Sequence, residues 1–195
     1  ADLDASIAAW QNPAADTPFG LILTMESADP ILGPDQVSEW YDLGLRMVSI
    51  SHYGTSTYSH GTGTEGGLLP PAKPLLDALK AAGIIVDLTH LTDQAHWELL
   101  EIYDGPVCAS HHNCRALTPG QRQLTDEMIR SVADRDGVIG AALDAWMLDQ
   151  STRPPRRSPW PDRYSSSADT RDATVHPDAS TPGGCRSANR GVGIE

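Results

Sequence analysis

The stretch Ile84-Ile85-Val86-Asp87-Leu88-Thr89-His90 decides the fold, because it predicts a buried strand and is followed at once by helix signals. Its β-branched and leucine side chains form a short apolar run, which is typical of a strand covered on both faces. Thr92 and Asp93 come next and can cap the amphipathic stretch 93–103 as a helix. The stretch therefore predicts one strand that leads directly into one helix.

The same alternation recurs along the first 150 residues. We expect strands near residues 20–25, 46–51, 84–89, 106–110 and 137–143, and helices at 36–43, 72–82, 93–103 and 125–135. Thr125 offers a second helix cap, and Gly83 and Gly137 stand where helices should end. Strands that alternate with helices predict βα units around a parallel sheet.

The composition excludes several classes of protein. The 195 residues suffice for one domain, and the formal charge of −12 argues against nucleic acid or an anionic membrane surface as a partner. Three cysteines without a Cys-x-x-Cys pair argue against a disulfide framework or a structural zinc knot. No apolar run is long enough to span a membrane, and no leader peptide is recognisable. We expect the true N-terminus to be missing, so the cellular compartment stays unknown.

The chain changes character near residue 150, which divides it into residues 1–150 and a tail, 151–195. The tail has seven Arg, seven Ser and six Pro but no Leu, Lys, Met or Phe, and so has little to bury. Two interpretations stay open: an irregular Arg/Ser/Pro-rich segment, or an out-of-frame continuation of a longer fold. Both leave residues 1–150 as the domain with a hydrophobic core.

Four of the expected strands are each followed by a side chain that can bind a metal ion. These side chains are Glu26, His52, His90 and His111. In a barrel of parallel strands the carboxyl ends meet at one face, so we expect the four to converge there. One carboxylate and three imidazoles are a ligand set suited to zinc. Asp87, on an otherwise apolar strand, could hold one of the imidazoles in place.

Each of these residues also has an ordinary explanation, since a histidine at a strand end is usually a hydrogen-bonded structural residue. Their joint pattern favours the metal site. His112 is an alternative ligand to its neighbour His111. The period of two in a strand favours His111, because it places His111 on the same face as Val107 and Ala109. The histidines without this pattern are expected to be solvated or structural: His60, His96 and His176.

The motifs at these strand ends resemble those of the membrane dipeptidase (renal dipeptidase) family of zinc peptidases, M19. The resemblance covers residues 18–148 and rests on the segments Gly20-Leu21-Ile22-Leu23-Thr24-Met25-Glu26, Val48-Ser49-Ile50-Ser51-His52-Tyr53, Val86-Asp87-Leu88-Thr89-His90, Ala109-Ser110-His111 and Arg122-Gln123-Leu124-Thr125-Asp126. It implies a TIM-type (β/α) barrel that hydrolyses dipeptides with a hydroxide activated by two zinc ions.

The resemblance also implies a role for five residues. Glu26 would bridge the two zinc ions, and His90 and His111 would complete one zinc site. His52 would be the catalytic residue that contacts the substrate carbonyl, and Arg122 would bind the carboxylate of a small dipeptide substrate. Neither nucleic acid nor a membrane is implied as a partner, and a homodimer stays open.

The sequence departs from the family pattern in three places. The family's first strand ends in His-x-Asp, which supplies the other zinc ion, and a later Gly-Ser-Asp-Phe-Asp-like segment contributes an aspartate; neither is present here. Tyr53 follows His52 where many members have Asn. We therefore expect an α/β fold, an incomplete TIM-type barrel without its first strand and C-terminal units, with weak or absent activity. Two other functions stay open: a related amidohydrolase acting on a non-peptide amide or lactam, and a non-catalytic remnant.

Overall fold

The structure, a computed structural model, describes residues 3–152 of the chain. Its five strands are β1 (Leu23–Glu26), β2 (Leu45–Ser49), β3 (Ile85–Asp87), β4 (Val107–His112) and β5 (Val138–Ala141). The helices are α1 (Leu3–Gln11), α2 (Val37–Asp42), α3 (Ala72–Ala82), α4 (Asp93–Ile102), α5 (Asp126–Ala133) and α6 (Ala145–Leu148), with short 3-10 turns η1 (Pro34–Gln36) and η2 (Gln150–Thr152). Each predicted strand and helix has a counterpart whose ends differ by a few residues, whereas α1 and α6 lie outside the predicted helices.

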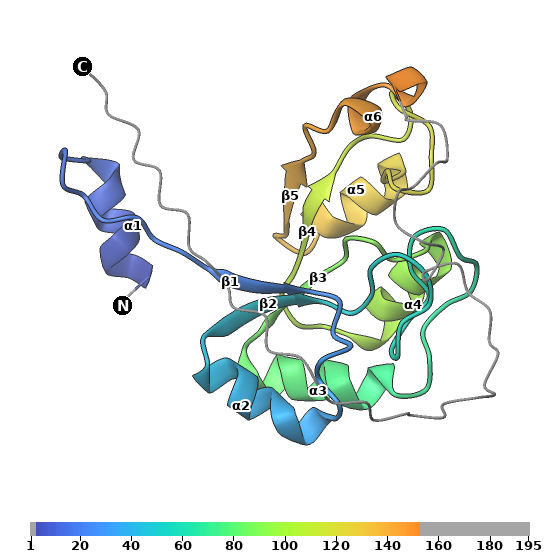
Figure 1. Cartoon of the computed structure of the whole chain (residues 1–195), viewed down its shortest axis with the longest axis horizontal. Helices are drawn as coiled ribbons and strands as arrows, with labels where there is room; N and C mark the ends of the chain where they lie inside the picture. Colours follow the sequence, from blue (N-terminus) through green and yellow to red (C-terminus); the bar gives the residue numbers. More distant parts are fainter. Residues whose placement is uncertain (1–2, 153–195) are drawn as a thin grey trace, which may run out of the picture.

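The strands form one sheet in the order β1-β2-β3-β4-β5, and every neighbouring pair is parallel. Figure 1 shows the helices beside this sheet, with α1 set apart at the end of an extended segment. Each new strand is added next to the preceding one, always on the same side of the sheet. This strand order is that of a (β/α) barrel, whereas in a doubly wound sheet the direction in which strands are added reverses. The predicted α/β fold with a parallel sheet is confirmed.

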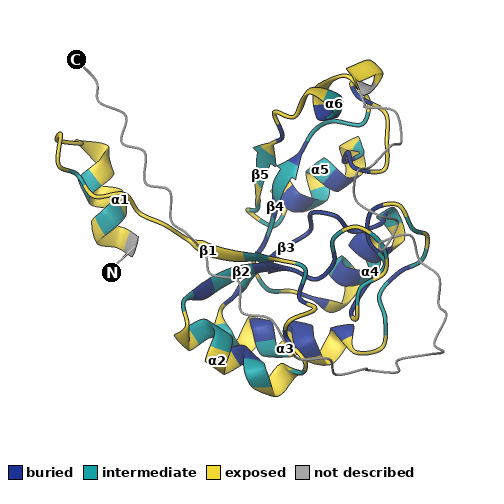
Figure 2. Ribbon diagram, in the orientation of Figure 1, coloured by how far each residue is buried: buried dark blue, intermediate teal, exposed yellow. Residues whose placement is uncertain are grey.

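The main core lies between the sheet and helices α2, α3 and α4. Leucines from one face of α3 pack with valines of the strands in a buried cluster that includes Leu75, Leu76, Leu79, Val48 and Val86. A smaller cluster of Ala109, Leu124 and Met128 joins β4 to α5. Figure 2 shows this burial along the strands and inner helix faces, while α1 and the segment before β1 are mostly exposed. Each fully buried Leu or Val contributes about 1.5–3 kcal/mol, so the two clusters fix the helices on the sheet.

The helix ends follow the predicted caps with one exception. The side chains of Thr92 and Thr125 accept hydrogen bonds from backbone N–H groups in the first turns of α4 and α5. Gly83 ends α3 with a left-handed φ of 72°. The prediction for Gly137 is wrong, because α5 ends at Ala133 and Asp134 is its C-cap residue. A Cβ at Gly137 would lie 2.7 Å from Val132, so close packing is what requires this glycine.

Two further predictions concern the tail and membrane-spanning segments. Of the tail, residues 151–195, all but the first two residues lie outside the described part of the chain, and so does His176. No helix among residues 3–152 is both long and apolar enough to cross a bilayer.

Candidate metal centre

Glu26, His90 and His111 lie together at the carboxyl ends of the strands. The Glu26 Oε1 atom is 2.8 Å from His90 Nε2 and 3.2 Å from His111 Nε2. The three potential ligand atoms lie within 4.8 Å of one another. His52 is next to them, with its Nε2 atom 3.7 Å from Glu26 Oε1. The structure thus brings together all four side chains that the strand-end pattern singled out.

The backbone is strained on both sides of this cluster. His90 has a φ of 72° and Ser27, directly after Glu26, has a φ of 75°. Residues other than glycine rarely adopt this left-handed region, at a cost of about 1–3 kcal/mol each. His90 is also buried, with 2% of its surface exposed. The surrounding fold therefore holds the His90 ring against Glu26 at the expense of local strain.

Two hydroxyl groups orient the imidazole rings of His90 and His111. Thr62 Oγ1 lies 3.0 Å from His90 Nδ1 and donates its own hydrogen to the His90 carbonyl oxygen. Ser110 Oγ lies 2.8 Å from His111 Nδ1 and donates to Asp87. Because both hydroxyl hydrogens are already donated, the Nδ1–H groups of His90 and His111 donate to the hydroxyl oxygens. The Nε2 lone pairs of both histidines therefore face Glu26. Asp87, which we expected to hold an imidazole in place, is linked to His111 through the Ser110 hydroxyl.

Strand β4 explains why His111 and not His112 joins the cluster. Val107 and Ala109 pack in the core clusters on the helix side of the sheet, and His112 is buried on that side as well. An irregularity in the β4–β5 register between Ala109 and His112 breaks the alternation and turns His111 toward Glu26. The residue chosen from the sequence agrees with this geometry, but the period-two argument for it is wrong.

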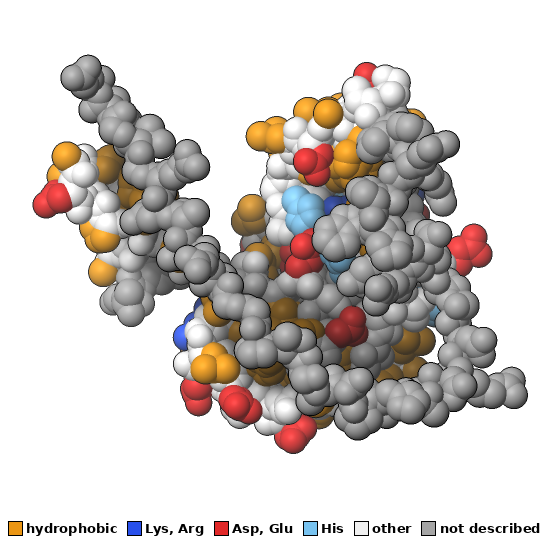
Figure 3. Space-filling view, in the orientation of Figure 1, with side chains coloured by type: hydrophobic (Ala, Val, Ile, Leu, Met, Phe, Trp, Pro, Cys, Tyr) orange, Lys and Arg blue, Asp and Glu red, His pale blue; other side chains and the backbone are white. Residues whose placement is uncertain are grey.

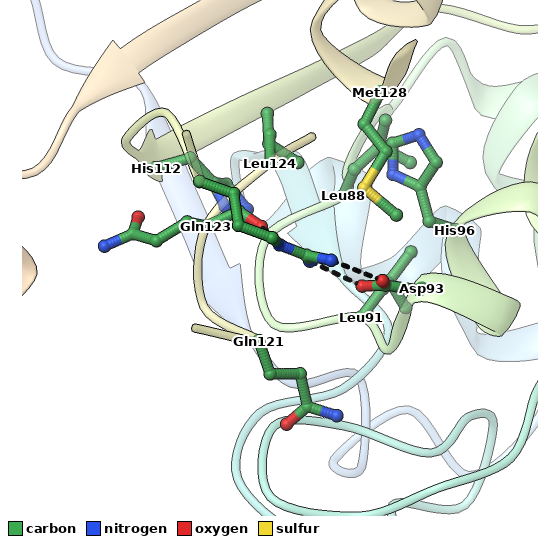
Figure 4. A pocket seen from close by; sticks show the side chains of 10 residues that line it. Leu88, Leu91, Asp93, His96, His112, Gln121, Gln123, Leu124 and Met128 are labelled. Atoms are coloured by element: carbon green, nitrogen blue, oxygen red, sulfur yellow. Dashed lines mark hydrogen bonds and ion pairs between the residues drawn. The ribbon is translucent and has the colours of Figure 1, made fainter. Parts of the chain in front are cut away.

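His112 occupies a different environment. Its Nδ1 atom donates to the backbone carbonyl of Arg122, and burial lowers its pKa to about 3. It lines a small cavity beside α4 and α5 that also contains His96 and Met128 (Figure 4). Asp93 in the same view forms an ion pair with Arg115. His112 is therefore a structural histidine of the helix-side core.

The metal-capable cluster opens into a cavity of about 200 Å³. The cavity is lined by Glu26, His52, Tyr53, His90, His111, Arg122, Asp144, Trp146 and Met147. Figure 3 shows histidine and acidic side chains gathered in the middle of one face of the molecule. Asp144, Trp146 and Met147 follow β5, and no strand-end pattern marks them in the sequence. The segment after a fifth strand thus contributes to a site that we had predicted from the ends of four strands.

Arg122 is a buried cation in the wall of this cavity. Only 6% of its surface is exposed, and within residues 3–152 its Nε and Nη1 atoms have no hydrogen-bond partner. Burial lowers the pKa of Arg122, while Tyr53 and Glu26 act in the opposite direction. The ordinary explanation of an arginine before a helix, a solvated surface charge, is wrong here. A buried guanidinium with unused donors is suited to bind an anion.

Burial also decides the protonation of the histidines around the cluster. It lowers the pKa of His90 to about 2, with a smaller contribution from Arg122, so His90 is neutral at pH 7 and offers a lone pair. His96 is buried against Ser131, with a pKa of about 4. His60 contacts the Thr55 hydroxyl in the loop after β2. Neither His60 nor His96 belongs to the metal-capable cluster.

A parallel βα sheet whose strands end in a carboxylate and imidazoles is typical of barrel metallohydrolases. Sequence comparison makes the assignment specific. Residues 5–177 match the model of the membrane dipeptidase family (peptidase family M19), and the chain belongs to this family. Family membership and the neighbouring structures support a metallopeptidase function.

The individual relatives are distant and longer than this chain. An uncharacterized protein in the PQQ-III 3' region of Acinetobacter calcoaceticus is 26% identical over 71% of the chain and 47% of its own length. An uncharacterized dipeptidase of Schizosaccharomyces pombe, C3A11.10c, is 26% identical over 60% of the chain and 30% of its own length. The chain thus spans about half, or less, of the length of these curated relatives.

Solved structures resemble the fold, and two of them show the extent of the similarity. A metallo peptidase from Rhodobacter sphaeroides, liganded with a phosphinate mimic of the dipeptide L-Ala-D-Ala, is 27% identical with a TM-score of 0.60. The match covers 65% of this chain and 39% of that one. The probable dipeptidase PvdM from Pseudomonas aeruginosa is 26% identical with a TM-score of 0.60, over 64% of this chain and 34% of that one. The fold is therefore that of part of a dipeptidase barrel.

Proposed function

We propose that this chain carries the zinc-binding and substrate-binding part of a dipeptidase that hydrolyses small dipeptides. The observation that supports this most directly is the cluster of Glu26, His90 and His111, whose ligand atoms lie within 4.8 Å of one another. The cluster shares its cavity with the buried cation of Arg122. A metal site and an anion site in one small cavity are what a peptide with a free carboxylate requires.

The donor set fits a zinc ion. Both imidazoles use Nδ1–H toward hydroxyl groups and turn Nε2 lone pairs toward the Glu26 carboxylate. Lone pairs that face a carboxylate oxygen at such short distances repel each other unless a cation lies among them. Two nitrogens and one carboxylate oxygen are ligands that zinc prefers. A zinc ion held by Glu26, His90 and His111 would polarise the scissile carbonyl and make water a better nucleophile at neutral pH.

His52 is the candidate catalytic residue. Its ring stands beside Glu26 and lies 4.3 Å, centroid to centroid, from the ring of His90. From this position its N–H can donate a hydrogen bond to the carbonyl oxygen of the peptide as charge develops there. A well-placed donor of this kind contributes about 3–4 kcal/mol to transition-state stabilisation in other hydrolases.

Arg122 is the candidate partner of the substrate carboxylate. Its Nε and Nη1 donors, which are unused in the described part of the chain, suit a carboxylate, and its Nη2 atom donates to the backbone carbonyl of His111 at 3.4 Å. This last contact links the carboxylate site to the strand end that also supplies a zinc ligand. The peptide would therefore be fixed at one end while its amide lies near the metal.

Zinc content tests the metal site. After dialysis against zinc and then buffer, we expect about one zinc per wild-type chain and almost none in the double variant His90→Ala, His111→Ala. His60→Ala, a histidine outside the cluster, is the matched control and should keep its zinc. Equal zinc content in the wild type and the double variant would remove the basis of the proposal.

Substrate binding tests the second part. We expect the zinc-loaded chain to bind L-Ala-D-Ala more tightly than L-Ala-D-Ala amide, because only the first offers a carboxylate to Arg122. Preference for the amide or for a lactam would favour a related amidohydrolase instead. Binding is the primary measurement, since we expect hydrolysis by this chain to be weak.

A further inference from the structure

A buried histidine of the helix-side core contacts the residue that is proposed to bind the substrate carboxylate. His112 ends β4, and 4% of its surface is exposed. Its Nδ1 atom lies 3.0 Å from the backbone carbonyl oxygen of Arg122. A carbonyl oxygen only accepts hydrogen bonds, so Nδ1 carries the hydrogen and donates it. His112 therefore binds the peptide group of Arg122 itself.

A second hydrogen bond joins the same two segments in the opposite direction. The Nη2 atom of Arg122 donates to the backbone carbonyl of His111 at 3.4 Å. This distance lies beyond the usual range of about 2.7–3.2 Å for N–H···O contacts, whereas the contact made by His112 lies within it. The hydrogen bond from His112 to the backbone of Arg122 is thus the better formed of the two.

Few other hydrogen bonds restrain Arg122. Its buried Nε and Nη1 atoms have no partner within residues 3–152, and in the same part of the chain no other hydrogen bond reaches its carbonyl oxygen. Buried donors without a partner are unfavourable, so the side chain would turn toward any acceptor that a shift of its backbone brought within reach. The orientation of the guanidinium toward the cavity therefore depends on the contact with His112.

The ordinary explanation of His112 is that its ring only fills space in the core. An apolar side chain would fill that space at a lower cost, because the Nε2 atom of His112 is buried without a partner among residues 3–152. The hydrogen bond to the Arg122 carbonyl is the contact that an apolar residue could not supply. A histidine at this position is consequently explained better by what it holds than by its volume.

We propose that His112 is a positioning residue that keeps the guanidinium of Arg122 in the orientation that binds the substrate carboxylate. The inference rests on the proposed function, in which Arg122 binds that carboxylate. His112 is not one of the residues that line the cavity of the metal-capable cluster, so it acts through Arg122 and without contact to the ligand. It favours binding because the cation is oriented before the ligand arrives.

A matched pair of variants tests the inference. Asparagine can place an N–H donor where His112 Nδ1 stands, whereas leucine has a similar branched shape without a donor. In the zinc-loaded chain we expect His112→Leu to bind L-Ala-D-Ala at least about 10-fold more weakly than His112→Asn does. Both variants should bind L-Ala-D-Ala amide equally well, because the amide has no carboxylate for Arg122. Isothermal titration measures these affinities.

His96→Leu is the control for general damage to the core. His96 is 2% exposed and lines the same small cavity as His112 (Figure 4), but it contacts Ser131. Its replacement should lower the melting temperature without changing the ratio of the affinities for the acid and the amide. If His112→Leu weakens acid and amide equally, or binds the acid as well as His112→Asn does, the inference is wrong.

A measurement on the wild type does not depend on how well the variants fold. If the hydrogen bond of His112 favours carboxylate binding, carboxylate binding must favour that hydrogen bond by the same factor. By NMR of a chain with isotope-labelled histidine, we therefore expect L-Ala-D-Ala to slow exchange of the His112 Nδ1 hydrogen with water about 10-fold. The amide should leave this rate unchanged, and the ring hydrogen of His96 is the reference. An exchange rate that L-Ala-D-Ala does not change would overturn the inference.

Failure of the proposed function gives a different result. If the wild type does not prefer L-Ala-D-Ala over its amide, Arg122 is not the partner of the carboxylate, and the proposed function fails together with the inference. If the wild type has this preference and His112→Leu keeps it in full, only the inference fails.

Discussion

The Thr62 hydroxyl lies 3.0 Å from the Nδ1 atom of His90, and both residues are buried. Thr62 belongs to the glycine-rich loop between β2 and α3, which folds back so that its Gly61 touches the carbonyl oxygen of His52. A Cβ at Gly61 would lie 2.2 Å from that oxygen. The loop is therefore part of the metal centre, because it fixes the ring of a proposed ligand and closes against the candidate catalytic residue.

Thr62→Val should weaken zinc binding. The valine keeps the shape but cannot accept the Nδ1–H of His90, so the ring loses its fixed tautomer and orientation. Hydrogen bonds of this kind typically change metal affinity by about 10–100-fold. Competition with a chromogenic chelator measures the change, and Thr57→Val, on an exposed threonine of the same loop, is the control. An unchanged zinc affinity in Thr62→Val would show that the hydroxyl has only a packing role.

Asp87→Asn should affect both zinc binding and stability. The Asp87 carboxylate accepts hydrogen bonds from the backbone of Thr89 and Ser110 and from both of their hydroxyls. Replacing it by a neutral amide weakens all of these contacts, so we expect a loss of at least about 2 kcal/mol in the free energy of unfolding. Urea titration measures this loss.

Ser110→Ala separates the two effects. It removes the hydroxyl that joins Asp87 to His111 but leaves the backbone contact of the carboxylate in place. We expect weaker zinc binding with a smaller loss of stability than in Asp87→Asn. A Ser110→Ala variant that binds zinc like the wild type would contradict the assignment of the proton on Nδ1 of His111.

Arg122→Ala should abolish the preference for a free carboxylate. We expect the affinity for L-Ala-D-Ala to fall about 100-fold, because a buried charge-assisted contact is lost, while L-Ala-D-Ala amide binds as before. Isothermal titration measures both affinities, with Arg130→Ala on the exposed face of α5 as the control. Equal losses for the acid and the amide would mean that Arg122 supports the cavity without binding the carboxylate.

His96 makes the stability of the fold depend on pH. Burial lowers its pKa to about 4 from the ordinary 6.5, with Asp93 opposing and Arg135 adding to this shift. The unfolded chain therefore binds a proton below pH 6.5 that the folded chain binds only near pH 4, so stability falls as the pH falls through this range. Between pH 7.5 and 5.0 we expect His96 to contribute about 2 kcal/mol of this loss.

The variant His96→Gln tests this dependence. Glutamine can still donate to Ser131 but does not titrate. The difference in unfolding free energy between pH 7.5 and 5.0 should therefore be about 2 kcal/mol smaller in the variant than in the wild type. Buried His90 and His112 remain in the variant, so part of the dependence of the unfolding free energy on pH should persist. His60→Gln, in the loop after β2, serves as the control. If the unfolding free energy of His96→Gln depends on pH as it does in the wild type, His96 does not contribute to this dependence.

The strands, their order and the residues that end them could be predicted because they depend on local pattern. Apolar runs such as Ile84–Val86 fix the strands, and parallel strands bring their ends to one face without any further information. The choice of Thr92 and Thr125 as helix caps is equally local. The side chains that meet at the strand ends could therefore be named from the sequence.

The supporting contacts depend on geometry that the sequence does not reveal. The irregularity in β4 reverses the faces of His111 and His112, and a strict alternation cannot anticipate it. Thr62 meets His90 only because a long loop returns over the site. The burial of Arg122 and the position of Asp144 depend on how the segment after β5 packs. Each of these is a long-range relation between parts that are distant in the chain.

The proposed zinc ligands come from strands with very different protection from solvent. Glu26 ends β1, which is an edge of the sheet and is mostly exposed, with Leu21 just before it 91% exposed. His90 follows the interior strand β3, and His111 lies in the interior strand β4. A zinc ion bound by all three would cross-link the edge strand to the interior strands. Local opening of β1 would remove Glu26 from the zinc ion. Zinc should therefore slow amide hydrogen exchange in residues 23–26 far more than in β3.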